Sequence, residues 1–83
     1  MKPPIYSKKS ARAINGMDSP TKQRIKAGIE DIPNGDIKPL QGAPGTYRLR
    51  IGDWRILFSY ADESKDRVKV KKVSPRGEAY KGV

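Results

Sequence analysis

The stretch Tyr47–Phe58 reads YRLRIGDWRILF, a Gly-Asp pair between two segments of alternating side chains. Alternation with a period of two is typical of a strand that is buried on one face. Gly52 and Asp53 predict a two-residue turn, and glycine in the first position favours type II′. We therefore expect a β-hairpin in which Ile51 lies opposite Trp54.

This turn fixes the facing pairs further along the hairpin. Arg50 falls opposite Arg55, and Leu49 falls opposite Ile56. Apolar and arginine side chains therefore project from opposite faces of the hairpin, because the side-chain period of a strand is two. Arg48, two residues before Arg50, joins the arginine face.

A third strand is expected over residues 67–73, where valines alternate with Lys69 and Lys71. Pro75 ends this strand, because proline cannot donate a hydrogen bond to a neighbouring strand. If the third strand pairs with the second, Lys69 and Lys71 extend the arginine face. We expect both lysines to bind phosphate there.

The residues before the hairpin predict an edge strand and a first helix. Residues 4–7 follow proline and favour a short edge strand with Ile5 facing the core. The helix is expected from a Ser7 cap to about Asn15, with Gly16 as its stop signal.

A second helix is expected after Asp18. Ser19 is its predicted N-cap, with Pro20 at the first helical position. Its apolar stripe has helical spacing and comprises Ile25, Ile29 and Ile32. Residues 33–35, Pro-Asn-Gly, end the helix, and residues 36–45 are expected to form a loop because proline and glycine interrupt any period.

The order of elements is βααβββ, which predicts an α+β fold. The helical isoleucine stripe requires an apolar surface, and the hairpin supplies one. We expect a helical hairpin packed on one face of a small antiparallel β-sheet. At 83 residues, the chain 1–83 is expected to form a single domain.

Composition limits the chemistry. The chain has 18 Lys and Arg against 9 Asp and Glu, a formal net charge of +9, and neither Cys nor His. Disulfide scaffolds, thiolate zinc sites and Cys nucleophiles are excluded, as are the commonest general base and metal ligand. We expect no cofactor and no metal, so any catalysis must use Arg, Lys, Tyr, Ser, Asp or Glu.

The positive charge indicates a polyanionic partner: nucleic acid, an anionic membrane or an acidic protein. The longest apolar run is Ile56–Phe58, far too short to span a membrane. The N-terminus has no apolar stretch typical of a signal peptide. We expect a cytoplasmic protein without a membrane partner.

The three arginines of the hairpin favour a phosphate-binding surface. Like charges facing each other across strands are destabilising, and no Asp or Glu is interleaved on this face of the hairpin. The guanidinium group binds phosphate through two parallel hydrogen bonds and stays charged. The alternative is that these are solvated side chains that protect a sheet from aggregation.

Three segments together resemble the RelE/ParE superfamily of bacterial toxins. The hairpin Tyr47–Phe58 resembles the sheet signature of that family, and Lys38–Gly42 resembles its K-P-L-x-G loop. Val73–Tyr80 resembles its closing R-x-x-x-Y segment. The resemblance covers nearly the whole chain in the right order, including the helical hairpin.

In the RelE branch, the resemblance implies a ribosome-dependent endoribonuclease that cleaves mRNA in the 30S A site. The ribose 2′-OH attacks the adjacent phosphate and leaves a 2′,3′-cyclic phosphate and a 5′-OH. The implied catalytic residues are Arg48, Arg50, Arg55, Arg76 and Tyr80. The family often has Lys at the two positions of Arg48 and Arg50, and arginine cannot act as a base. Tyr80 and solvent remain as candidates for the general base.

The resemblance also implies partners and alternatives. Type II toxins are neutralised by a cognate antitoxin, and the toxin–antitoxin complex is expected to bind operator DNA through the antitoxin. A ParE-like inhibitor of DNA gyrase would share the fold without the catalytic set. An inactive nucleic-acid-binding relic is the third possibility.

Overall fold

The computed structural model describes residues 2–75 and contains two helices and a five-stranded mixed sheet. Along the sheet the strand order is β1-β5-β4-β3-β2, with β1 parallel to β5 and the other pairs antiparallel. The elements are β1 (Ile5–Tyr6), α1 (Lys8–Asn15), α2 (Ser19–Glu30), β2 (Asp36–Pro39), β3 (Tyr47–Ile51), β4 (Trp54–Tyr60) and β5 (Val68–Pro75). The expected α+β class is confirmed, but the sheet is mixed instead of wholly antiparallel, because β1 joins β5 in parallel.

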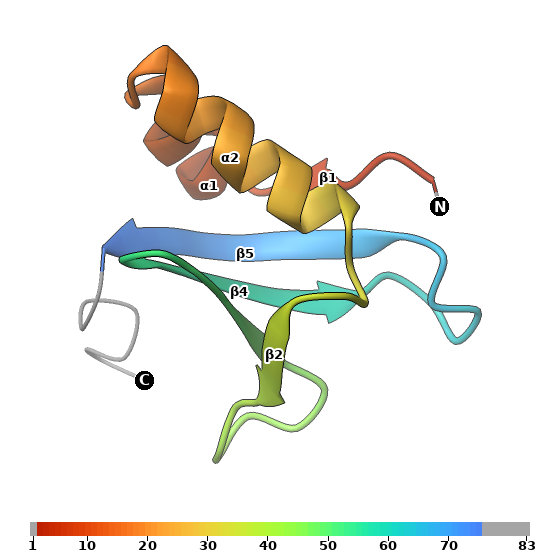
Figure 1. Ribbon diagram of the computed structural model, residues 1–83. Helices are drawn as coiled ribbons and strands as arrows, with labels where there is room; N and C mark the ends of the chain where they lie inside the picture. Colours follow the sequence, from red (N-terminus) through yellow and green to blue (C-terminus); the bar gives the residue numbers. More distant parts are fainter. Residues whose placement is uncertain (1, 76–83) are drawn as a thin grey trace.

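Both helices lie on one face of the sheet, α1 over β5 and α2 beside β3 (Figure 1). Ser7 caps α1 as predicted, its side chain accepting a hydrogen bond from the N–H of Ser10. The cap of α2 is Asp18, which accepts from the N–H of Thr21, so the predicted Ser19 cap is wrong by one residue. Either side chain can satisfy the free N–H groups of a first turn, and the sequence alone does not choose between neighbours.

The core fills the space between the helices and the sheet. Isoleucines from the helical layer meet the apolar face of β3, β4 and β5, as the stripe predicted. Its buried members are Ile14, Ile25, Ile29, Ile32, Leu49, Ile56, Phe58, Val68, Val70 and Val73. Ile32 lies beyond the end of α2 at Glu30 but still contributes to the core.

The hairpin has the predicted register. Ile51 pairs with Trp54, and Arg50 pairs with Arg55. Gly52 has a φ of +57°, whereas Asp53 is not among the residues with positive φ, as a type II′ turn requires.

Two expectations for the edge strands are wrong. Residues 36–39 form β2 instead of a loop, paired with β3 at the sheet edge. Ile5 does not face the core and is 42% exposed. The register of β1 sets Ile5 beside Lys69 and Tyr6 beside Val70, so Tyr6 is the residue that packs on the core. The third strand also continues past Val73 to Pro75.

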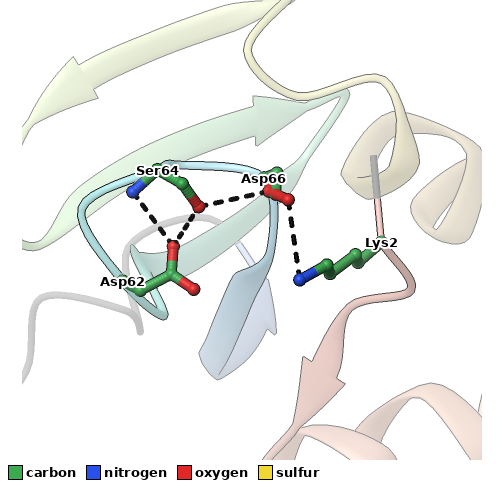
Figure 2. A network of polar contacts seen from close by, with 4 residues as sticks. All are labelled: Lys2, Asp62, Ser64 and Asp66. Carbon is green, nitrogen blue, oxygen red and sulfur yellow. Dashed lines mark hydrogen bonds and ion pairs between the residues drawn. The ribbon is translucent and has the colours of Figure 1, made fainter.

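The N-terminal segment is attached to the turn between β4 and β5. The backbone N–H of Lys2 donates to the Asp66 carbonyl at 2.8 Å, and its Nζ lies 3.7 Å from Asp66 Oδ2. Figure 2 shows the Ser64 hydroxyl between the carboxylates of Asp62 and Asp66. The hydrogen bonds from Ser64 lower the pKa of Asp62 below its usual value. This network holds the chain start beside the sheet edge where β1 pairs.

Gly52→Ala is expected to destabilise the fold by about 1–2 kcal/mol, because alanine is strained in the left-handed region. Its Cβ would also lie 2.9 Å from Nη2 of Arg24. Gly16→Ala is the matched control: Gly16 has a φ of −83°, and its new Cβ would have no neighbour closer than 3.6 Å. Chemical denaturation of both variants measures the difference, and equal stabilities would contradict the proposed role of the turn.

Stability is expected to fall at alkaline pH through Tyr6. Burial, and then the Glu30 carboxylate, raise the pKa of Tyr6 above its usual value. The stabilising effect is fully present below the unfolded-state pKa of about 10, and it is lost as pH rises through the higher folded-state pKa. Tyr6→Phe should therefore flatten the alkaline decline of the unfolding free energy, whereas an unchanged slope would refute this assignment.

Candidate functional site

The sheet face opposite the helices carries the arginine cluster. We call it the helix-free face, since α1 and α2 both lie on the other side. Arg50 and Arg55 face each other directly across β3 and β4, and Arg48 lies two pairs further along on the same face, opposite Leu57. The predicted grouping of three arginines on one face is thus present in the structure.

One row of side chains crosses four strands of this face. Ser74 on β5 pairs with Arg55 on β4, Arg55 pairs with Arg50 on β3, and Arg50 pairs with Asp36 on β2. We call these four residues the arginine row. Directly opposite residues have Cβ atoms about 4.5–5.5 Å apart, so the row forms one continuous polar surface.

Asp36 corrects the expectation that no acidic residue is interleaved with the arginines. Its Oδ1 accepts a hydrogen bond from Nη2 of Arg48 at 3.4 Å. The side chain of Arg48 is 12% exposed and that of Asp36 is 48% exposed. The acid belongs to β2, the strand missed in the sequence, and its contact to Arg48 relieves part of the repulsion among the arginines.

Arg55 is the most buried arginine of the cluster, with 7% of the residue exposed. Its Nη1 donates to the carbonyl oxygen of Trp54 at 3.4 Å, a long hydrogen bond. No carboxylate of residues 2–75 forms an ion pair with Arg55. A buried charge without a counter-ion is unfavourable, so Arg55 favours the approach of an anion.

A β-bulge shapes the lysine side of the face. Leu57 pairs with Lys72 and Phe58 pairs with Val70, which leaves Lys71 without a directly opposite residue on β4. The Nζ of Lys71 donates to Thr46 Oγ1 at 3.0 Å, just before the start of β3. Because β4 lies between β3 and β5, the Lys71 side chain bridges the face across the central strand.

The N-terminus of α1 fixes the backbone at this bulge. Ser10 donates its buried hydroxyl to the carbonyl oxygen of Val70 at 3.3 Å. The Ser7 hydroxyl donates to the carbonyl oxygen of Lys71 at 3.1 Å. These two contacts hold the irregular part of β5 from the helical side, and they position the lysine that crosses the other side.

The remaining predicted residues divide into two groups. Lys69 is exposed on β5, opposite Ser59 and away from the arginine row. Arg76 and Tyr80 lie outside the described residues. Sequence reasoning missed Asp36 and Ser74, and the signal for Asp36 was the short alternation of residues 36–38 around Ile37.

The arrangement suits a phosphodiester. Arg48, Arg50 and Arg55 bring three fork-shaped donors to adjacent positions, and bidentate guanidinium contacts are the strong form of phosphate recognition. Such donors stabilise negative charge that develops on a phosphoryl group, but they cannot remove a proton. The described part of the face can therefore bind and polarise a phosphate.

Neither helix within residues 2–75 has the length and hydrophobicity needed to cross a membrane. Comparison with protein-family models finds no match. Comparison with curated protein sequences also finds none.

Solved structures of toxin–antitoxin complexes share the fold. A chain of the RelB–RelE antitoxin–toxin complex from Methanococcus jannaschii superposes with a TM-score of 0.70 at 22% identity, covering 92% of this chain and 94% of that one. A chain of the RelBE2 complex from Mycobacterium tuberculosis superposes with a TM-score of 0.63 at 19% identity, covering 88% of this chain and 95% of that one. A chain of the intact E. coli RelBE complex superposes with a TM-score of 0.65 at 16% identity, covering 90% of this chain and 95% of that one. The chain therefore has a RelE-like fold.

Proposed function

We propose that this protein is the toxin of a type II toxin–antitoxin system and acts as a ribosome-dependent endoribonuclease on mRNA. The observation that carries the proposal is the arginine cluster on the helix-free face, with Arg55 buried and without a carboxylate partner in residues 2–75. The RelE-like fold supports the same function, since the matched structures are toxin–antitoxin complexes.

In the proposed reaction, the ribose 2′-oxygen attacks the adjacent phosphorus and the bond to the 5′-oxygen breaks. The products are a 2′,3′-cyclic phosphate and a 5′-OH. Arg55 and Arg48 hold the non-bridging oxygens and stabilise their developing charge, and Arg50 adds positive charge near the attacking oxygen. The 2′-OH proton leaves to a base, Tyr80 or water. The 5′-oxygen takes a proton from water, while Arg76 stabilises its negative charge.

The proposed partners follow from charge. Residues 7–30, which include both helices, hold six basic residues and two acids. This surplus complements an acidic segment of a cognate antitoxin, and electrostatic complementarity accelerates such association. We further propose that the toxin–antitoxin complex binds operator DNA through the antitoxin, and that the free toxin acts on mRNA in the 30S A site in the cytoplasm.

Arg55→Ala should relieve the growth arrest that wild-type protein causes when induced in bacterial cells. Loss of a donor to the transition state lowers the cleavage rate by about 10²–10³-fold. Arg12→Ala, which removes an exposed arginine from α1, is the matched control and should retain toxicity. Mapping of RNA 5′ ends measures cleavage, and thermal unfolding establishes that both variants fold.

Persistent arrest in Arg55→Ala, with intact messages and accumulated gyrase–DNA adducts, would overturn the ribonuclease proposal in favour of a ParE-like inhibitor. Arg55→Lys separates charge from geometry. It keeps the cation but not the planar fork, so cleavage should lie between those of wild type and Arg55→Ala.

Asp36→Asn should strengthen RNA binding. The substitution removes the carboxylate that competes with phosphate for Arg48. One unit charge about 4 Å away contributes about 1 kcal/mol at the dielectric constant of water, which changes affinity by about 5-fold. Stability should change by less than about 1 kcal/mol, because the pair is exposed on the Asp36 side. Glu63→Gln makes the same charge change in the β4–β5 turn and should leave affinity unaltered. Fluorescence anisotropy with a single-stranded RNA measures both, and weaker binding by Asp36→Asn would contradict the competition.

A further inference from the structure

The hydroxyl of Ser74 is a nearly covered polar group without a partner on the helix-free face. Ser74 is 5% exposed, and its Oγ forms no hydrogen bond in the described chain. Nearly all buried polar groups of native proteins are hydrogen-bonded, and each exception requires a physical reason. The fold does not use this hydroxyl, although leaving it unsatisfied is destabilising.

The neighbour of Ser74 in the arginine row has the same property. Arg55 pairs with Ser74 across β4 and β5, so both side chains lie on the helix-free face. Arg55 is 7% exposed and makes only the long contact to Trp54 within residues 2–75. Two adjacent, nearly buried groups therefore offer donors for which the described protein supplies no strong acceptor.

We propose that Ser74 and Arg55 together bind one phosphate of the RNA backbone, with the Ser74 hydroxyl donating to a non-bridging oxygen that the guanidinium also contacts. This inference rests on the proposed function for the identity of the ligand. A hydroxyl donor beside a guanidinium suits a tetrahedral oxyanion, because it adds a donor from outside the guanidinium plane. Ser74 is thus a substrate-binding residue in addition to the arginines.

The proposal has an unusual consequence for stability. Ser74→Ala replaces an unsatisfied hydroxyl by hydrogen and leaves no new polar group without a partner, so the folded state is not weakened. The same change removes a donor to the phosphate, so binding is weakened. A residue with a purely structural role would instead lose stability and binding together.

The experiment measures both quantities on the full chain. The binding probe is a fluorescent single-stranded RNA with 2′-O-methyl groups, which cannot be cleaved by 2′-OH attack. For Ser74→Ala we expect about 10-fold weaker binding, the usual effect of one hydrogen bond to a charged group, and a melting temperature equal to or above wild type. Ser74→Thr, which keeps a hydroxyl and suits a strand, should bind within about 2-fold of wild type.

Ser59→Ala is the matched control, because it removes a half-buried hydroxyl from β4 on the same face, opposite Lys69. It should bind RNA as wild type does. Unchanged binding in Ser74→Ala, or a fall in melting temperature together with affinity, would overturn the inference. So would a wild-type protein that does not bind the probe.

A separate cleavage assay distinguishes this inference from the proposed function. If wild-type protein binds the probe through Ser74 but does not cut translated messages, the phosphate site stands and the ribonuclease proposal fails. If wild type cuts messages and Ser74→Ala cuts and binds them equally well, the ribonuclease stands and the role of Ser74 fails.

Discussion

The pairing of β3 with β4 across Gly52 and Asp53 determines which side chains lie on each face of the sheet. The turn sets Leu49 beside Ile56 on the helical side and Arg50 beside Arg55 on the other. A shift of one residue would exchange the two faces and bury arginines against the isoleucines of α2. The hydrophobic core therefore holds the register, and the register in turn holds the arginines together. Folding and the proposed phosphate recognition depend on one local geometry, in which Gly52 occupies the left-handed region.

The helix-free face is costly for the folded protein in ways that an anion would offset. Arg50 and Arg55 repel each other across a strand pair, Arg55 is buried with a single long hydrogen bond in the described chain, and Ser74 is unsatisfied. Each feature weakens the fold when nothing is bound and strengthens interaction with a phosphate. The only relief within residues 2–75 comes from Asp36, and that contact goes to Arg48, the neighbour of the arginine row. Several unfavourable groups on one face favour the binding of an anion there, because the anion would satisfy them together.

Period and turn chemistry were sufficient to predict the helices, the hairpin and its three arginines, because each depends on neighbouring residues. Features set by distant contacts were not predictable. β2 has a single inward apolar residue, Ile37, and its strand form depends on hydrogen bonds to β3. The bulge at Lys71 adds a residue that simple alternation cannot reveal. The expected third strand ended at Val73, so neither the burial of Ser74 nor its position beside Arg55 could be inferred.

Because the chain has no histidine, charge stabilisation and proton transfer in the proposed reaction fall to different groups. The arginines can neutralise charge at every stage of phosphoryl transfer, but they cannot exchange a proton at neutral pH. Electrostatic stabilisation is commonly the largest contribution to catalysis, so a site built on arginine alone can still accelerate the reaction strongly. Proton transfer must then be supplied by Tyr80, by water or by the bound RNA and its ribosomal surroundings. An enzyme that polarises a phosphate without a strong base of its own would be slow on free RNA and fast where its substrate is held in line for attack. The proposed dependence on the ribosome is therefore what a catalytic site built on arginine would require.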